Sequence, residues 1–259
     1  ERIKDYSKNT IISQWFEDHL ADTGPDFSSN RKKLLKYDDF IKSNFITTHP
    51  STLDFLKKKN NFHYLPIPVD KNIEKLKIYE NKNQICDVFF SMSHGVNRGK
   101  LKRDKVDERH NFISDLITEC PNIIFDIYGY KNREPVWAED FYKVIVNSKM
   151  ALNLTRGRPL KYLTSNRIAS LIGNGLLTFI DKKTKLNNFF NNNEVIFYSG
   201  LQDLADKINY YKSNDFSRIK IAKNGRKKYF DLFECQKVAN YIISKSFDRE
   251  IPKLLKWMD

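Results

Sequence analysis

Residues 144–181 constrain the fold more strongly than any other stretch of this chain. Two short apolar runs, 150–154 and 176–180, have the length of buried strands and are bounded by turn-forming residues. A basic loop at 155–164, containing Gly and Pro, separates the first run from a segment with the apolar i, i+3, i+4 spacing of a helix. Ser165 stands where it can cap the first turn of that helix. The stretch therefore predicts a strand–loop–helix–strand unit of a parallel sheet.

The loop and the helix start predict an anion site. Parallel sheets bind ligands at the carboxyl ends of their strands, where helix N-termini offer free N–H groups and partial positive charge. Basic and neutral hydrogen-bonding groups gather here, namely Arg156, Arg158, Lys161, Arg167, Asn153, Gly157, Ser165 and Asn166. Each of them alone could equally solvate a surface loop. Their coincidence with a glycine and a helix start favours a diphosphate-binding site.

A second basic loop follows the strand predicted at 86–92. Gly95 and Gly99 would let backbone N–H groups approach a phosphate, with Arg98 or Lys100 supplying charge. A mobile surface loop would have the same composition, so the position after a first strand carries the prediction. His94 lies in the same loop.

Strands and helices alternate through the rest of residues 84–235. Helices are predicted at 106–120, 137–149 and 201–212, and strands at 122–129 and 194–198. Tyr128 and Tyr130 flank Gly129 at a strand end, where an aromatic ring could stack on a nucleobase or simply join the core. We expect a Rossmann-like, doubly wound parallel sheet, an α/β fold.

The flanking segments predict a partial second α/β domain. Strands are expected at 10–18, 40–47 and 62–69, with a short helix at 52–59. We expect residues 1–70 to form that domain, 71–83 a linker, and 236–259 a C-terminal helix that packs back toward residues 1–70. Asp18 or His19 is a further candidate for a catalytic base.

The chain resembles the GT-B glycosyltransferases, in particular the group-1-like branch that includes CgeB-type proteins. Leu152-Asn153 matches a strand end of that branch, Arg167 its Arg, and Gly175 the Gly before its next strand. The segment 65–70 resembles the family's Leu-Pro-x-Pro-x-Asp lead into the interdomain linker. Ser170 departs from the pattern, because the family has a Glu there that grips the donor's ribose, and Tyr162 stands where many retaining members have another Glu.

The resemblance implies a glycosyltransferase that moves a sugar from a nucleotide-diphosphate sugar to an acceptor. Arg167, Lys161 and His94 would be catalytic. Donor contacts would come from Arg98, Lys100, Gly129, Tyr128, Asn153, Arg156, Gly157, Ser165, Asn166 and Arg167. No metal or other cofactor is expected, and most of the acceptor-side domain would lie upstream of residue 1. A catalytically inactive relative stays open, because both carboxylates are missing.

Composition narrows the partners. The 45 Lys and Arg residues against 32 Asp and Glu give a net charge of +13, which favours acidic partners such as nucleotide diphosphates. A nucleic-acid-binding module is the alternative from another class, but no recognition motif is present and no nucleic acid is expected. The acceptor, whether glycan, lipid-linked or protein, is left open, as is a peripheral contact with an anionic membrane. Three widely spaced cysteines favour a reducing, cytoplasmic setting.

Overall fold

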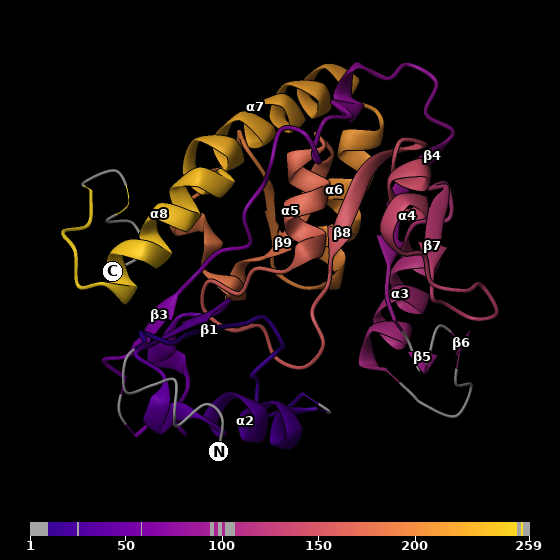
Figure 1. Ribbon diagram of the computed structural model, residues 1–259. Helices are drawn as coiled ribbons and strands as arrows, with labels where there is room; N and C mark the ends of the chain where they lie inside the picture. The colour runs from indigo at the N-terminus through magenta and orange to yellow at the C-terminus, as the bar shows by residue number, and fades with distance from the viewer. Residues whose placement is uncertain are drawn as a thin grey trace.

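The computed structural model describes residues 10–24, 26–57, 59–93, 96–97, 100–101, 107–252 and 255, with only the backbone described at 96–97 and 100–101. Two parallel sheets, one small and one large, lie at opposite ends of the molecule (Figure 1). A two-residue antiparallel ribbon of β5 (Val96–Asn97) and β6 (Lys100–Leu101) accompanies them. None of the described helices has the length and hydrophobicity that a membrane crossing needs.

The small sheet comes from the N-terminal part of the chain. Its strands β1 (Ser13–Phe16), β2 (Ser43–Ile46) and β3 (Phe62–Tyr64) are parallel and stand in that order. Helix α2 (Phe27–Leu35) supplies Leu34 to a buried core that it shares with the sheet. Prolines after β3 cannot donate ladder hydrogen bonds, so this strand is shorter than the expected 62–69.

The large sheet has five parallel strands in the order β10-β9-β8-β4-β7. Their bounds are β4 (Cys86–Ser91), β7 (Phe125–Tyr128), β8 (Ser148–Asn153), β9 (Leu177–Asp181) and β10 (Ile196–Tyr198). The chain runs outward from β4 to β7 and then returns to build β8, β9 and β10 on the other side. The strand order therefore reverses between β4 and β8, which confirms the doubly wound α/β fold.

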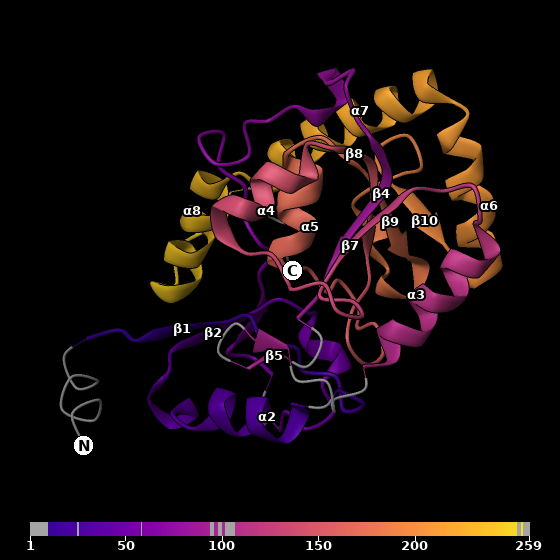
Figure 2. The ribbon, with the colours of Figure 1, turned by 90° about the vertical axis from the view of Figure 1, so that its right-hand side faces the viewer.

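Helices cover both faces of this sheet (Figure 2). On one face α3 (Glu108–Glu119) and α6 (Leu201–Lys212) share a core with the strands. On the other, α4 (Ala138–Ile145) and α5 (Asn166–Gly173) do the same, and α7 (Asp215–Phe233) packs against α5 and β9. The helix expected at 137–149 ends earlier, because Lys149 already belongs to β8.

The last helix, α8 (Cys235–Ser246), joins the two ends of the molecule. It follows α7 directly and runs back to the small sheet (Figure 1). Tyr241 of α8 is fully buried, and its ring meets that of Phe45 of β2 edge-on at a centroid distance of 6.2 Å.

The helix expected at 52–59 does not form. Among the described residues of this stretch there is a 3₁₀ turn, Pro50–Thr52. The N–H groups of Leu53 and Leu56 donate to carbonyl oxygens three residues earlier, as in a 3₁₀ helix, and both side chains are buried in the core of the small sheet.

Candidate functional site

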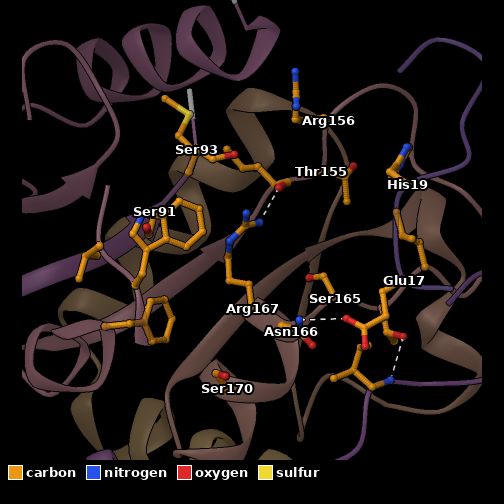
Figure 3. A pocket seen from close by; sticks show the side chains of 18 of the residues that line it. Glu17, His19, Ser91, Ser93, Thr155, Arg156, Ser165, Asn166, Arg167 and Ser170 are labelled. Carbon is orange, nitrogen blue, oxygen red and sulfur yellow. Dashed lines mark hydrogen bonds between the residues drawn. The ribbon is translucent and has the colours of Figure 1, made fainter. Parts of the chain in front are cut away.

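A cavity of about 560 Å³ lies where the two sheets face each other. Its floor and one wall come from the carboxyl ends of β4 and β8, the two strands between which the sheet order reverses. Open α/β sheets bind ligands at this place, because the loops on either side lead away in opposite directions and leave a crevice. The end of β1 supplies the opposite wall (Figure 3).

The N-terminus of α5 points into the cavity. Ser165 is the N-cap residue, yet its side chain makes no capping hydrogen bond. Asn166 begins the helix and donates from Nδ2 to the Glu17 carboxylate at 3.1 Å, a contact that spans the cavity between the two sheets (Figure 3). Ser165, Asn166 and Arg167 all line the cavity.

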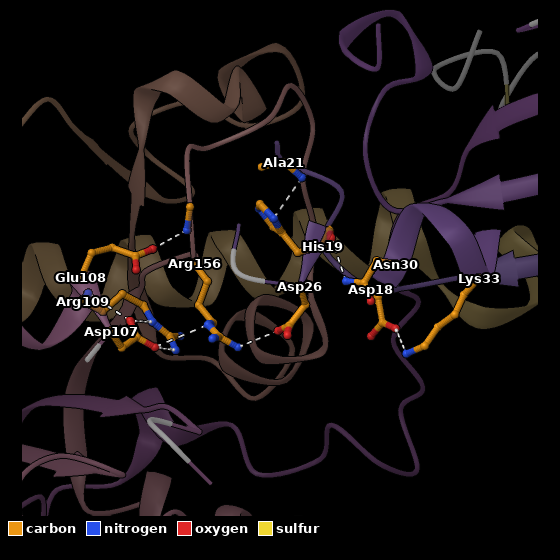
Figure 4. Close-up of polar contacts among 11 residues, drawn as sticks. Asp18, His19, Ala21, Asp26, Asn30, Lys33, Asp107, Glu108, Arg109 and Arg156 are labelled. Carbon is orange, nitrogen blue, oxygen red and sulfur yellow. Dashed lines mark hydrogen bonds and ion pairs between the residues drawn. The ribbon is translucent and has the colours of Figure 1, made fainter. Parts of the chain in front are cut away.

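Of the three described arginines that line the cavity, two are paired with carboxylates (Figure 4). Arg109 is buried and makes a bidentate contact with Asp107, at 2.9 Å from Nε and 2.6 Å from Nη2. Arg156 lies between two carboxylates, with Nη1 3.1 Å from Asp26 and Nε 3.5 Å from Asp107. These charges are compensated by the protein itself.

Arg167 differs from these two arginines. Its Nη1 donates to the carbonyl oxygen of Leu154 at 2.7 Å, and its guanidinium lies 4.9 Å from the centre of the Phe90 ring. Within the described part of the chain no carboxylate comes within 4.0 Å of it. Burial lowers the pKa of Arg167 to about 9, with the nearby Arg109 charge contributing second. The guanidinium is still protonated at neutral pH, so it is a cation in the cavity without a carboxylate partner among the described residues.

The wall at the end of β1 is acidic. Glu17, Asp18 and His19 line the cavity from this side, and Asp18 lies 3.8 Å from Lys33. Burial, followed by the Arg156 charge, lowers the pKa of His19 to about 4, so the imidazole is neutral at pH 7. Its Nδ1 accepts a hydrogen bond from the Ala21 N–H, which assigns the ring proton to Nε2.

One part of the cavity lining is largely apolar. Val136, Trp137 and Phe141 line the cavity where the loop after β7 enters α4. Trp137 is 56% exposed and is one of the residues that line the cavity. Tyr128, expected to stack on a base, is not among the lining residues, and the Arg133 guanidinium lies 3.7 Å from its ring centre.

The structure brings part of the predicted site together. Arg156, Ser165, Asn166 and Arg167 line the cavity, whereas Lys161, Gly157, Tyr128, Gly129 and Asn153 do not. His94 and Arg98 lie outside the described residues, and only the backbone of Lys100 is described, in β6.

Lys161 is kept from the cavity by its neighbours in the chain. Leu160 and Leu163 are buried in the core of the small sheet, and the Lys161 carbonyl accepts hydrogen bonds from the His49 N–H at 2.9 Å and the Thr48 hydroxyl at 2.8 Å. Its Nζ lies 4.8 Å from the Tyr162 ring centre. The loop predicted to hold phosphate therefore also binds the two ends of the molecule together.

Sequence reasoning missed Trp137 and Glu17. Trp137 directly precedes a helix whose first turn carries two acidic residues, Glu139 and Asp140. Acidic residues at this position are typical of a helix start, so the sequence around Trp137 gives no sign of a ligand-binding role. Glu17 ends a strand beside the hypothesised Asp18 and His19. Only the arrangement of the two sheets shows that these residues border one cavity.

Comparison with known proteins identifies the family. The model of the glycosyl transferase-like family matches residues 105–244, more than half of the chain. No curated protein matches in sequence.

Solved structures share the fold at low sequence identity. HepE from Anabaena, in complex with UDP, has a TM-score of 0.65 and 12% identity over 95% of this chain and 74% of its own. TarM has a TM-score of 0.60 and 12% identity over 90% of this chain and 50% of its own. Sucrose-phosphate synthase from Thermosynechococcus elongatus has a TM-score of 0.57 and 10% identity over 95% of this chain and 70% of its own.

The fold is that of GT-B glycosyltransferases, while the narrower CgeB-type branch stays a prediction. The chain belongs to the glycosyl transferase-like family.

Proposed function

We propose that this chain transfers a sugar from a nucleotide-diphosphate sugar to an acceptor hydroxyl. The observation that carries the proposal is the guanidinium of Arg167 inside the cavity, which has no carboxylate partner in the part of the chain that the structure describes. A desolvated cation without a counter-charge is costly, and a bound anion removes that cost. The N-terminus of α5 adds free N–H groups and partial positive charge at the same place, which suits a diphosphate.

The chemistry of the lining supports a nucleotide sugar. The apolar residues around Trp137 suit a base, Arg167 suits the diphosphate, and Glu17 suits the hydroxyls of a sugar and of the acceptor. The lining therefore offers chemically suitable groups for the three parts of one donor.

UDP is the nucleotide we propose first. HepE, whose fold this chain shares at 12% identity, has been solved with UDP, with UDP and glucose, and with UDP-glucose. That identity is too low to transfer a substrate, so UDP-glucose is a starting probe for this chain. We also propose that the transfer needs no metal ion. The acceptor is a hydroxyl group of a glycan, a lipid-linked molecule or a protein.

In the transfer step, the acceptor oxygen forms a bond to the anomeric carbon while the bond from that carbon to the diphosphate oxygen breaks. The leaving diphosphate takes the electron pair, and Arg167 with the α5 N–H groups stabilises its developing charge. The acceptor proton passes to Glu17, which reaches across the cavity to Asn166, the neighbour of Arg167. His19 is unsuited to this role, because its Nε2 carries the proton and its Nδ1 is engaged by Ala21.

Calorimetric titration with UDP, GDP, CMP and dTDP tests the donor site. We expect one nucleotide to bind, and Arg167→Gln to weaken that binding by about tenfold or more, equivalent to at least about 1.4 kcal/mol. Arg31→Gln is the matched control, because Arg31 is an exposed arginine of α2 outside the cavity, and it should leave affinity unchanged. Folded protein that binds none of the four, or binds equally well without Arg167, would contradict the proposal.

A further inference from the structure

Four large apolar side chains are exposed at the end of the large sheet that lies opposite the cavity. Ile85 is 71% exposed and directly precedes β4, and Ile124, 56% exposed, directly precedes β7. Tyr210, 54% exposed, lies in the last turn of α6, and Phe216, 82% exposed, lies in the first turn of α7. The cavity is at the carboxyl ends of the strands, so the strand starts are at the other end of the sheet (Figure 1). We call these four residues the basal surface.

One buried carboxylate connects the segments that carry the basal surface. Asp87, the second residue of β4, accepts the Ile124 N–H through Oδ2 at 2.9 Å. The same oxygen lies 3.0 Å from Nζ of Lys212, the last residue of α6. Ile85 stands two residues before Asp87, and α7 begins three residues after Lys212. The four apolar side chains therefore belong to one part of the molecular surface.

The charged groups that join these segments are compensated within the protein. Besides Lys212, Asp87 has Nζ of Lys149 at 3.5 Å from its Oδ1. At the start of α7, Asp215 Oδ1 lies 2.9 Å from Nε of Arg218, whose Nη1 donates to the Lys149 carbonyl oxygen at 3.3 Å. Each of these five side chains thus has an opposite charge within 4.0 Å. The basal surface therefore offers a partner mainly apolar area, and exposed apolar area of this kind marks an interaction site.

A second copy of this chain is the partner that the basal surface fits. The net charge of +13 makes two copies repel each other in general, and the repulsion is least where the charges are already paired. A two-fold axis through the basal surface sets the same apolar side chains against each other, because an interface of this symmetry uses one patch twice. Both cavities stay open, since each lies at the far end of its own sheet. We propose that the basal surface joins two copies of this chain into a two-fold symmetric dimer.

The molar mass in solution as a function of concentration, measured by sedimentation equilibrium, tests the inference. We expect the wild-type protein to approach the mass of a dimer as its concentration rises, since association follows mass action. Phe216→Ser should weaken dimerisation by about tenfold or more, because a few large side chains carry most of the affinity of an interface. Ile85→Ser should weaken it in the same direction. Added salt should strengthen the wild-type dimer, because screening reduces the repulsion between two cationic copies.

Phe247→Ser is the matched control, because Phe247 is also an exposed phenylalanine but follows α8 beside the small sheet. It should leave the dissociation constant of the dimer unchanged, and thermal unfolding of each variant checks that it folds. A wild type that stays monomeric at every concentration overturns the inference, and so does a dimer that both Phe216→Ser and Ile85→Ser leave intact. Binding of monomers to vesicles of anionic phospholipid, abolished by Phe216→Ser, would assign the basal surface to a membrane and overturn the inference as well.

Discussion

The three cavity arginines show how neighbours decide what a residue can do. Arg109 and Arg156 have the same side chain as Arg167, but Asp107 and Asp26 already satisfy their charges. A paired guanidinium gains little from a bound anion, since it must give up a partner to make the new contact. Arg167 has no such partner among the described residues. If the cavity binds a diphosphate as we propose, Arg167 should therefore contribute more of the binding energy than Arg109 or Arg156.

His19 gives a pH prediction at the same scale. Its pKa is about 4 in the folded protein against the ordinary 6.5 expected when unfolded, so the unfolded chain binds the proton more readily between these values. The neutral ring therefore contributes stability above pH 6.5, and this contribution, on the order of 3 kcal/mol, is lost as the pH falls to about 4.

Urea unfolding at pH 7 and pH 4.5 measures this effect. The wild type should lose about 2 kcal/mol more than His19→Gln between the two pH values. Carboxylates that titrate in the same range act on both proteins alike, so the comparison isolates His19. Parallel losses in the two proteins would show that His19 is not held neutral by its surroundings.

At the scale of elements, Gly129 is the residue that directly follows β7, and it packs against the chain beside the cavity. It has φ +71°, and a Cβ there would lie 1.8 Å from the carbonyl oxygen of Met92, a cavity-lining residue. Gly129→Ala should lower the free energy of unfolding by about 3 kcal/mol, from about 1–2 for the left-handed backbone and about 1–3 for the clash. Urea unfolding provides the measurement.

Gly200 is the control for this substitution. It also has positive φ, at +90°, but nothing lies within 4 Å of an added Cβ. Gly200 has φ 90° and ψ 177°, a region essentially reserved for glycine, so Gly200→Ala should show only the backbone cost of about 1–3 kcal/mol. If both substitutions cost the same, the close approach to Met92 is not what requires a glycine at position 129.

The loop between β8 and α5 shows how far sequence reasoning reached. The strand, the helix with its N-cap Ser165 and the cavity residues Arg156 and Arg167 follow from local periodicity and charge. Lys161 looked equivalent in the sequence, but its position depends on Leu160 and its neighbours, which bury themselves against the small sheet. Long-range packing of this kind has no local signature, so the sequence could not separate Lys161 from the arginines.

At the scale of the whole molecule, the cavity exists only because the two sheets are held against each other. Asn166 donates a hydrogen bond to Glu17 across the cavity. Asp26, from the part of the chain that forms the small sheet, pairs with Arg156, which follows a strand of the large sheet. Alternation of strands and helices predicted the doubly wound sheet. This alternation could not predict which side chains after β1 would face the cavity. Their placement depends on how α8 and the β8–α5 loop pack against the small sheet.

Release of UDP from UDP-glucose, with water as the acceptor of the glucosyl group, tests the central claim most directly, because it requires groups from both ends of the molecule. The wild type should release UDP. Arg167→Gln should bind UDP at least about tenfold more weakly and turn over correspondingly less. Glu17→Gln should keep UDP affinity within about twofold but lower turnover by about a hundredfold or more, as expected for loss of a general base. Binding of UDP with no turnover by the wild type, or turnover unchanged in both variants, would contradict the account.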